Sequence, residues 1–263
     1  MRNRFRDAKT RIDWAKKDIT KFERKARNFF KNTPYGLVIE PELDGIHELH
    51  KFRLAKKIPP VLTRHTVYAI ENLRHALDLA AVEVGRLCNA TNLVDVHFPF
   101  CKTKADIKSR INSAACKELP DEIKTLFSSF EPYNGGNDLL WAINELCNTS
   151  KHRLILPVAG QTGVNIPLIE TAGLITHPIE IMEGVSNSVE DEVVYARTQL
   201  GIKWKHRVQV AIGIAFGKVE VVEGQPVHVT LREMLRIVSE IVSATENECH
   251  RLGLFDFHRA IIG

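Results

Sequence analysis

The feature that most constrains the fold is a periodic apolar pattern in the first thirty residues. Apolar side chains recur every three or four positions, which draws one stripe down a helix of about seven turns. The stripe consists of Ile12, Ala15, Ile19, Phe22, Ala26 and Phe29. Since barely three heptads are present, packing against the same chain is favoured over a coiled-coil partner.

The same segment is basic. Residues 1–31 hold 12 Lys and Arg against 4 Asp and Glu, whereas the whole chain of 263 residues has a net charge of only +4. Such a run of cations is typical of a solvated helix face, and it also fits an electrostatic contact surface for nucleic acid. Both interpretations remain open, and we expect a basic amphipathic helix over 1–33.

A β-hairpin is predicted next, between residues 35 and 55. Asp44-Gly45 lies between two apolar runs, and Gly supplies the positive φ that a tight turn requires. His47 and His50 form an H-x-x-H pattern, but on a strand these positions face opposite sides, so a shared metal is not expected. We predict no metal site.

The middle of the chain, 60–153, reads as a helical core. A long helix from Pro60 to about Leu87 is striped by Ala69, Leu73, Ala76, Ala80 and Val84. Shorter helices are expected after Thr103, which has Asp106 three residues on, and at Pro120. Asn137 is expected to cap a further helix that ends near Arg153.

From residue 154 the pattern changes to short β runs separated by Gly and polar turns, with Val227 to Val229 as the last run. Thr230 and Glu233 then form a capping-box pattern that predicts a final helix over 230–250. We therefore predict a single α+β domain: a mainly helical bundle with a β-hairpin after the first helix and a small antiparallel sheet before the last helix.

Composition excludes several classes of protein. The 44% hydrophobic content suits a buried core, and the five cysteines are scattered without a C-x-x-C pair. No apolar run reaches the length of a membrane span, and the charged start does not resemble a signal peptide. We expect a cytoplasmic protein with no cofactor, because P-loop, dinucleotide, zincin and nucleophile-elbow motifs are all missing.

Two predicted helix faces could carry chemistry. On the 60–87 helix, Glu71, His75 and Asp78 share one side, with Arg74 four residues before Asp78. A carboxylate beside an imidazole suits general acid or base catalysis, although a salt-bridged surface gives the same pattern. We expect His75, Asp78, His152 and Arg153 as catalytic candidates.

The second face lies on the helix that follows Asn137. Trp141, Glu145, Asn148 and His152 follow one another at helical spacing, and Trp141 indicates that this face is covered. If the two faces meet, His75, Asp78, Asn148 and His152 form one buried polar cluster. Binding roles are expected for Arg74, Asn148, Lys151 and Trp141.

Several segments together carry a resemblance to a known family: 72–78 (NLRHALD), 98–100 (FPF), Pro132-Tyr133 and 148–153 (NTSKHR). The chain resembles an uncharacterised bacterial protein family over nearly its whole length, with His75 in place of the usual serine and Ser150 in place of the usual aspartate. More distantly, its helical part is similar to HEPN domains, which are often metal-independent ribonucleases. Their Arg-to-His signature has one match, from Arg251 to His258.

Three functional classes remain open. A binding or regulatory protein without catalysis is favoured, because no motif requires an enzyme. A HEPN-like metal-independent ribonuclease or RNA-binding protein of a toxin or defence system is the alternative, with an unnamed enzyme class third. RNA or a protein is the expected partner, and the HEPN resemblance implies a homodimer.

Overall fold

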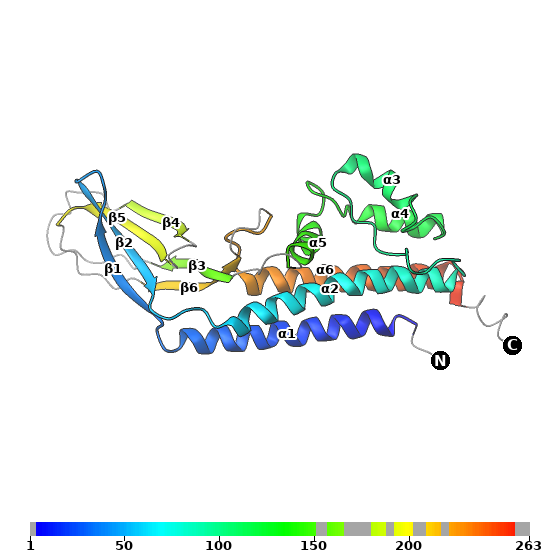
Figure 1. Ribbon diagram of the computed structural model, residues 1–263, viewed down its shortest axis with the longest axis horizontal. Helices are drawn as coiled ribbons and strands as arrows, with labels where there is room; N and C mark the ends of the chain where they lie inside the picture. The colour runs from blue at the N-terminus through cyan, green and yellow to red at the C-terminus, as the bar shows by residue number, and fades with distance from the viewer. Residues whose placement is uncertain are drawn as a thin grey trace. The chain divides into compact units, whose positions relative to one another are not determined.

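The computed structural model describes residues 4–150, 157–165, 180–187, 192–201, 209–216 and 221–255. Its long helices are α1 (Arg6–Phe30), α2 (Pro60–Leu87) and α6 (Val227–Arg251) (Figure 1). Shorter ones are η1 (Lys104–Asp106), α3 (Ile107–Ile111), α4 (Asp121–Ser129) and α5 (Asp138–Ser150). The strands are β1 (Tyr35–Pro41), β2 (His47–Leu54), β3 (Pro157–Asn165), β4 (Glu180–Asn187), β5 (Glu192–Gln199) and β6 (Gln209–Phe216).

The α+β prediction is confirmed by these elements, and the chain forms two compact units. Residues 1–21, 65–154 and 230–263 make a helical unit, while 22–64 and 155–229 make a unit that holds the strands. Three of the four boundaries fall inside helices, in α1, α2 and α6, and neither unit is a continuous stretch of chain. The prediction of one domain for the whole chain stays a prediction.

The helical unit is built on the stripe predicted for the 60–87 helix. Ala69, Leu73, Ala76, Ala80 and Val84 are each at most 1% exposed. Small alanines and larger side chains are mixed along this stripe, so neighbouring helices approach closely and interdigitate. Replacing a fully buried leucine such as Leu73 by alanine typically costs about 2–5 kcal/mol.

Local capping signals were read correctly in this unit. The Thr103 N–H and hydroxyl both donate to the Asp106 carboxylate, and Asn137 Oδ1 accepts the backbone N–H of Leu140 at 3.0 Å. Both contacts satisfy N–H groups at the start of a helix. Pro120 lies at the N-cap of α4, where it makes no side-chain capping hydrogen bond.

The strand unit contains a four-stranded antiparallel sheet in the order β1-β2-β5-β4 and a two-stranded pair, β3-β6. The predicted hairpin is β1-β2, with Gly45 at φ 69° in its turn. It is not a separate element, because β2 pairs with β5 from His47↔Gln199 to Arg53↔Glu192. Lys51 of β2 further links β1 to β5, because its Nζ lies 2.7 Å from Glu40 and 3.1 Å from the buried Glu192.

The predicted start of the last helix was wrong. Residues 227–229 are helical rather than extended, and Thr230 lies inside α6, 4% exposed, instead of capping it. Val227 and Leu231 are both fully buried and four residues apart. The apolar stripe of the helix therefore already includes Val227, and this period overrides the short alternation that suggested a strand.

None of the described helices is both long and apolar enough to span a bilayer.

Candidate functional site

Arg74 and Asp78, two of the predicted site residues, hold a loop against α2. Arg74 pairs with Asp78, its Nε donates to Asn144 Oδ1 on α5 at 3.3 Å, and its guanidinium lies 4.5 Å from the ring centroid of Phe100. The Asp78 carboxylate also accepts the backbone N–H of Phe98 at 3.0 Å. Both side chains are therefore engaged in fixing the Phe98-Pro99-Phe100 loop.

A histidine that sequence reasoning did not single out lies next to this loop. His97 Nδ1 donates to the Asp95 carbonyl at 2.7 Å, and its Nε2 accepts from Arg110 Nη2 at 2.6 Å. Burial and the charge of Arg110 lower the pKa of His97. A neutral imidazole with both nitrogens occupied serves as a structural link. No spacing rule connects these residues, so the sequence carried no signal for them.

Helices α2 and α5 do meet, but through Asn144 and Ser150 of α5, which do not belong to the predicted polar face, and not as the buried cluster that was predicted. Ser150 Oγ lies 3.4 Å from Glu71 Oε1, which joins α5 to α2 in the same region as the contact between Arg74 and Asn144. Trp141 is covered as expected, at 9% exposed. His75 and Asn148, however, are exposed. The error arises because helical spacing gives a face but not how deeply that face is buried.

Lys151, His152 and Arg153 lie outside the described residues, as does His258. Their predicted catalytic and binding roles stay predictions.

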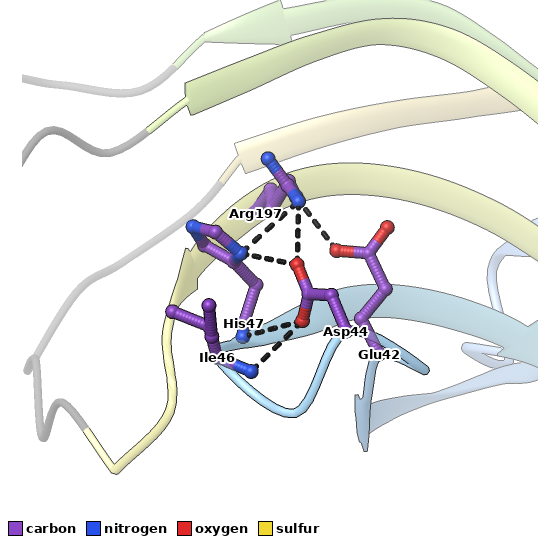
Figure 2. Close-up of polar contacts among 5 residues, drawn as sticks. All are labelled: Glu42, Asp44, Ile46, His47 and Arg197. Carbon is purple, nitrogen blue, oxygen red and sulfur yellow. Dashed lines mark hydrogen bonds and ion pairs between the residues drawn. The ribbon is translucent and has the colours of Figure 1, made fainter.

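A second polar cluster, in the strand unit, was missed by the sequence reasoning. Arg197 of β5 reaches the tip of the hairpin, where its Nε donates to Glu42 at 2.7 Å and its Nη2 donates to Asp44 at 2.9 Å (Figure 2). His47 Nδ1 lies 2.5 Å from the same Asp44 carboxylate and 3.0 Å from Arg197 Nη2. Asp44 Oδ1 also accepts the N–H groups of Ile46 and His47, each at 2.9 Å.

Three of these side chains have the composition of a metal site. Ligand atoms of Glu42, Asp44 and His47 all lie within 4.8 Å of one another. The Arg197 guanidinium, however, contacts all three, so it takes the place that a cation would occupy (Figure 2). The hydrogen bonds from His47 and from the turn hold the pKa of Asp44 well below its usual range. We interpret the cluster as a structural link between the hairpin and β5, and we call Glu42, Asp44, His47 and Arg197 the hairpin lock.

The remaining candidate surface is the basic side of α1 within the helical unit. Between Arg6 and Lys21, four cations are exposed, Arg6, Lys16, Lys17 and Lys21, against two exposed carboxylates, Asp7 and Asp13. Lys9, by contrast, is paired with Glu246 of α6. In this unit α3 and α4 lie on the far side of α2 from α1 (Figure 1).

Two polar contacts fix how α1 lies along α2. Asp18 Oδ1 is 2.8 Å from His65 Nδ1, and Arg11 Nη1 donates to Asn72 Oδ1 at 3.0 Å. Each pair of positions on one helix is seven residues, or two turns, apart, and the order is reversed between the helices. The two helices therefore run antiparallel and in register.

His75 lies one turn beyond Asn72, the partner of Arg11, at one end of this contact. Partial burial of the ring and the charge of Arg11 lower the pKa of His75, against the opposing effects of Asp78 and Glu71. An exposed imidazole whose pKa is lowered is neutral near pH 7 and can accept a proton.

Comparison with known proteins adds no relative: no family model matches this chain, and neither a curated protein nor a solved structure resembles it significantly.

Proposed function

We propose that this protein binds RNA through the helical unit and that binding, rather than catalysis, is its function. The observation that carries the proposal is the exposed basic side of α1 between Arg6 and Lys21. Cations that remain in solvent neutralise phosphates at little cost in desolvation, and they supply most of the sequence-independent affinity for nucleic acid.

The state of the α2 residues supports binding over chemistry. Asp78 is engaged by Arg74 and by the Phe98 N–H, so it is not free to orient an imidazole. Arg74 is likewise held by Asp78, Asn144 and Phe100. A general acid or base needs a group that can reach its substrate, and neither side chain meets this requirement.

Charge reversal on α1 tests the proposal. We expect Lys16→Glu/Lys17→Glu to weaken binding of a fluorescein-labelled single-stranded RNA 12-mer by about tenfold or more at 50 mM KCl, measured by fluorescence anisotropy. The matched control is Lys108→Glu/Lys117→Glu, two exposed lysines of the α3 region with the same change in charge. The control should bind within about threefold of wild type.

Two results would contradict this function. One is wild-type protein that shows no salt-sensitive binding of RNA. The other is equal weakening in the α1 variant and in the control, because net charge alone would then explain the effect.

A metal-independent ribonuclease is the second candidate, and the position of His75 favours it. A neutral, exposed imidazole could take the proton of a 2′-hydroxyl, and the adjacent Arg11 could stabilise the negative charge that develops on phosphorus. The test is cleavage of mixed RNA in EDTA by wild type, His75→Ala and His152→Ala. Cleavage that either substitution abolishes would make the protein an enzyme, and its absence would leave the binding function.

The cytoplasm is the compartment that we propose with this function. All five cysteines are free thiols, and the thiol of Cys249 is fully buried. Free thiols in this number suit a reducing compartment. A homodimer remains part of the proposal as an expectation, to be checked by light scattering of the full chain.

A further inference from the structure

Two exposed aromatic side chains lie on the helical unit without an evident structural reason. Trp14 of α1 is 46% exposed and Tyr68 of α2 is 48% exposed. They are the two aromatic residues among the exposed large hydrophobic side chains of the part of the chain that the structure describes. Large aromatic rings left in water are a common sign of a binding surface.

The register of the two helices brings these rings to the same level. Trp14 lies between Arg11 and Asp18 in the sequence, and Tyr68 lies between His65 and Asn72. Since Asp18 contacts His65 and Arg11 contacts Asn72, the midpoints of the two stretches must lie opposite one another. Trp14 and Tyr68 therefore stand across from each other where α1 meets α2.

Both rings also lie on the same side of this contact. The next residue on each helix, Ala15 and Ala69, is fully buried in the core. On each helix the two residues that contact the other helix lie, around the circumference, between the buried alanine and the aromatic ring. Trp14 and Tyr68 are therefore both rotated past the contact, away from the core and towards solvent. We call Arg11, Trp14, Tyr68 and His75 the aromatic seam.

Cations border the aromatic seam. The Arg11 guanidinium carbon lies 5.1 Å from the ring centroid of Trp14, a cation–π contact that keeps the charge beside the ring. Lys17 and Lys21 follow Trp14 at spacings of three and seven and are exposed. A surface that binds single-stranded nucleic acid combines aromatic faces, on which bases stack, with a row of cations that contacts the phosphates.

From this arrangement we propose that unpaired bases of single-stranded RNA stack on Trp14 and Tyr68 while the phosphates follow Lys17 and Lys21. This inference rests on the proposed RNA-binding function and narrows it to a class of ligand. In a duplex the base faces are stacked on one another, so a seam of this kind discriminates against double-stranded RNA. An apolar protein partner would instead bind without regard to ionic strength.

The first test compares aromatic variants on three probes: a single-stranded A12 RNA, a 12-base-pair RNA duplex, and a 12-mer in which the central four bases are removed. Trp14→Ala and Tyr68→Ala should each weaken A12 binding by about fivefold or more, because stacking on one ring contributes at this level. Trp14→Phe and Tyr68→Phe keep an aromatic ring, so these variants should retain most of the wild-type affinity for A12. Val94→Ala, which trims an apolar side chain that is 92% exposed elsewhere in the unit, should have no effect.

The probes separate failure of this inference from failure of the function. Stacking would be overturned if all three probes bound equally, in a salt-sensitive way, and if the alanine variants bound them as wild type does. The proposed RNA-binding function would then still stand. Absence of binding to all three probes would overturn both. Circular dichroism of each variant checks that the helices are retained.

Tryptophan fluorescence gives a second, direct readout. Trp14 is exposed whereas Trp141 is 9% exposed, so a base stacked on Trp14 should quench an accessible part of the emission. The third tryptophan, Trp204, would add its own signal, so every protein in this test carries Trp204→Phe. In that background we expect A12 to quench the parent protein and Tyr68→Ala but not Trp14→Phe. Quenching that persists at the same level in Trp14→Phe would contradict a base on this ring.

Discussion

The Asp78 carboxylate accepts the backbone N–H of Phe98 at 3.0 Å, twenty residues along the chain. This one contact gives the segment Asn72 to Asp78 a structural explanation. Asp78 anchors the loop, Arg74 pairs with Asp78 and covers Phe100, and Asn72 accepts from Arg11. Residues whose types suggested acid–base chemistry thus hold the helical unit together.

Replacing Asp78 should therefore lower stability and leave RNA binding unchanged. Asp78→Ala leaves the Phe98 N–H and the Arg74 guanidinium without their acceptor, which should cost about 1–3 kcal/mol in the free energy of unfolding. Asp78→Asn keeps an acceptor oxygen and should cost less. Urea unfolding at pH 7 measures both, and RNA affinity is compared at 10 °C, where the variants are folded.

The control for this prediction is Asp121→Ala. The Asp121 side chain is 94% exposed and pairs with Lys124, so its loss should cost less than about 1 kcal/mol. A catalytic or ligand-contacting Asp78 would give the opposite pattern: little change in unfolding and a large loss of binding or turnover.

The hairpin lock predicts a pH dependence of stability. Hydrogen bonds lower the pKa of Asp44 in the folded state, so the folded protein binds fewer protons there than the unfolded chain. Its stabilising contribution is present above the unfolded pKa of about 4 and is lost as the pH falls towards the folded value. Asp44→Asn should therefore lower Tm at pH 7, and the difference from wild type should shrink below about pH 4.

Arg197→Met tests the same lock from the partner strand. Because Arg197 donates to both Glu42 and Asp44, its loss should lower Tm at pH 7 more than Arg236→Met does. The ion pairs of Arg236 are exposed and lie within α6, one turn to either side. Equal effects of the two substitutions would contradict a lock between hairpin and β5.

The environment of His75 predicts a measurable titration. Partial burial and the Arg11 charge should bring the pKa of His75 below the ordinary value of about 6.5. Arg11→Met removes the charge and should raise this pKa, whereas Arg11→Lys keeps the charge and should change it little. Two-dimensional NMR of the histidine ring protons measures all three proteins, and a pKa that does not respond to Arg11→Met would show that the two side chains are not neighbours.

Local signals in the sequence predicted much of the fold. The stripe from Ala69 to Val84 and the cap at Asn137 depend on residues a few positions apart, and the structure confirms both. Contacts between distant residues were not predictable in this way. Arg197 meets Asp44 across 153 positions, and β2 pairs with β5 across a similar distance, so no window of the sequence contains both partners.

The candidate site follows the same division. Helical spacing placed Arg74 and Asp78 on one face, but it could not show that the Asp78 carboxylate accepts a hydrogen bond from the backbone N–H of Phe98. Trp14 and Tyr68 were not singled out at all. Their meeting depends on the register of α1 against α2, which is fixed by Arg11 and Asp18 and has no signature within either helix.

The salt dependence of RNA binding tests the central claim most directly. Log Kd for the single-stranded 12-mer is measured against log [KCl] for wild type, Lys16→Gln/Lys17→Gln and Lys108→Gln/Lys117→Gln. If α1 neutralises phosphates, each contacting lysine contributes about 0.7 to the slope, so the first variant should lose up to about 1.4 and the second nothing. A wild-type slope of zero, or the same slope in all three proteins, would contradict the account.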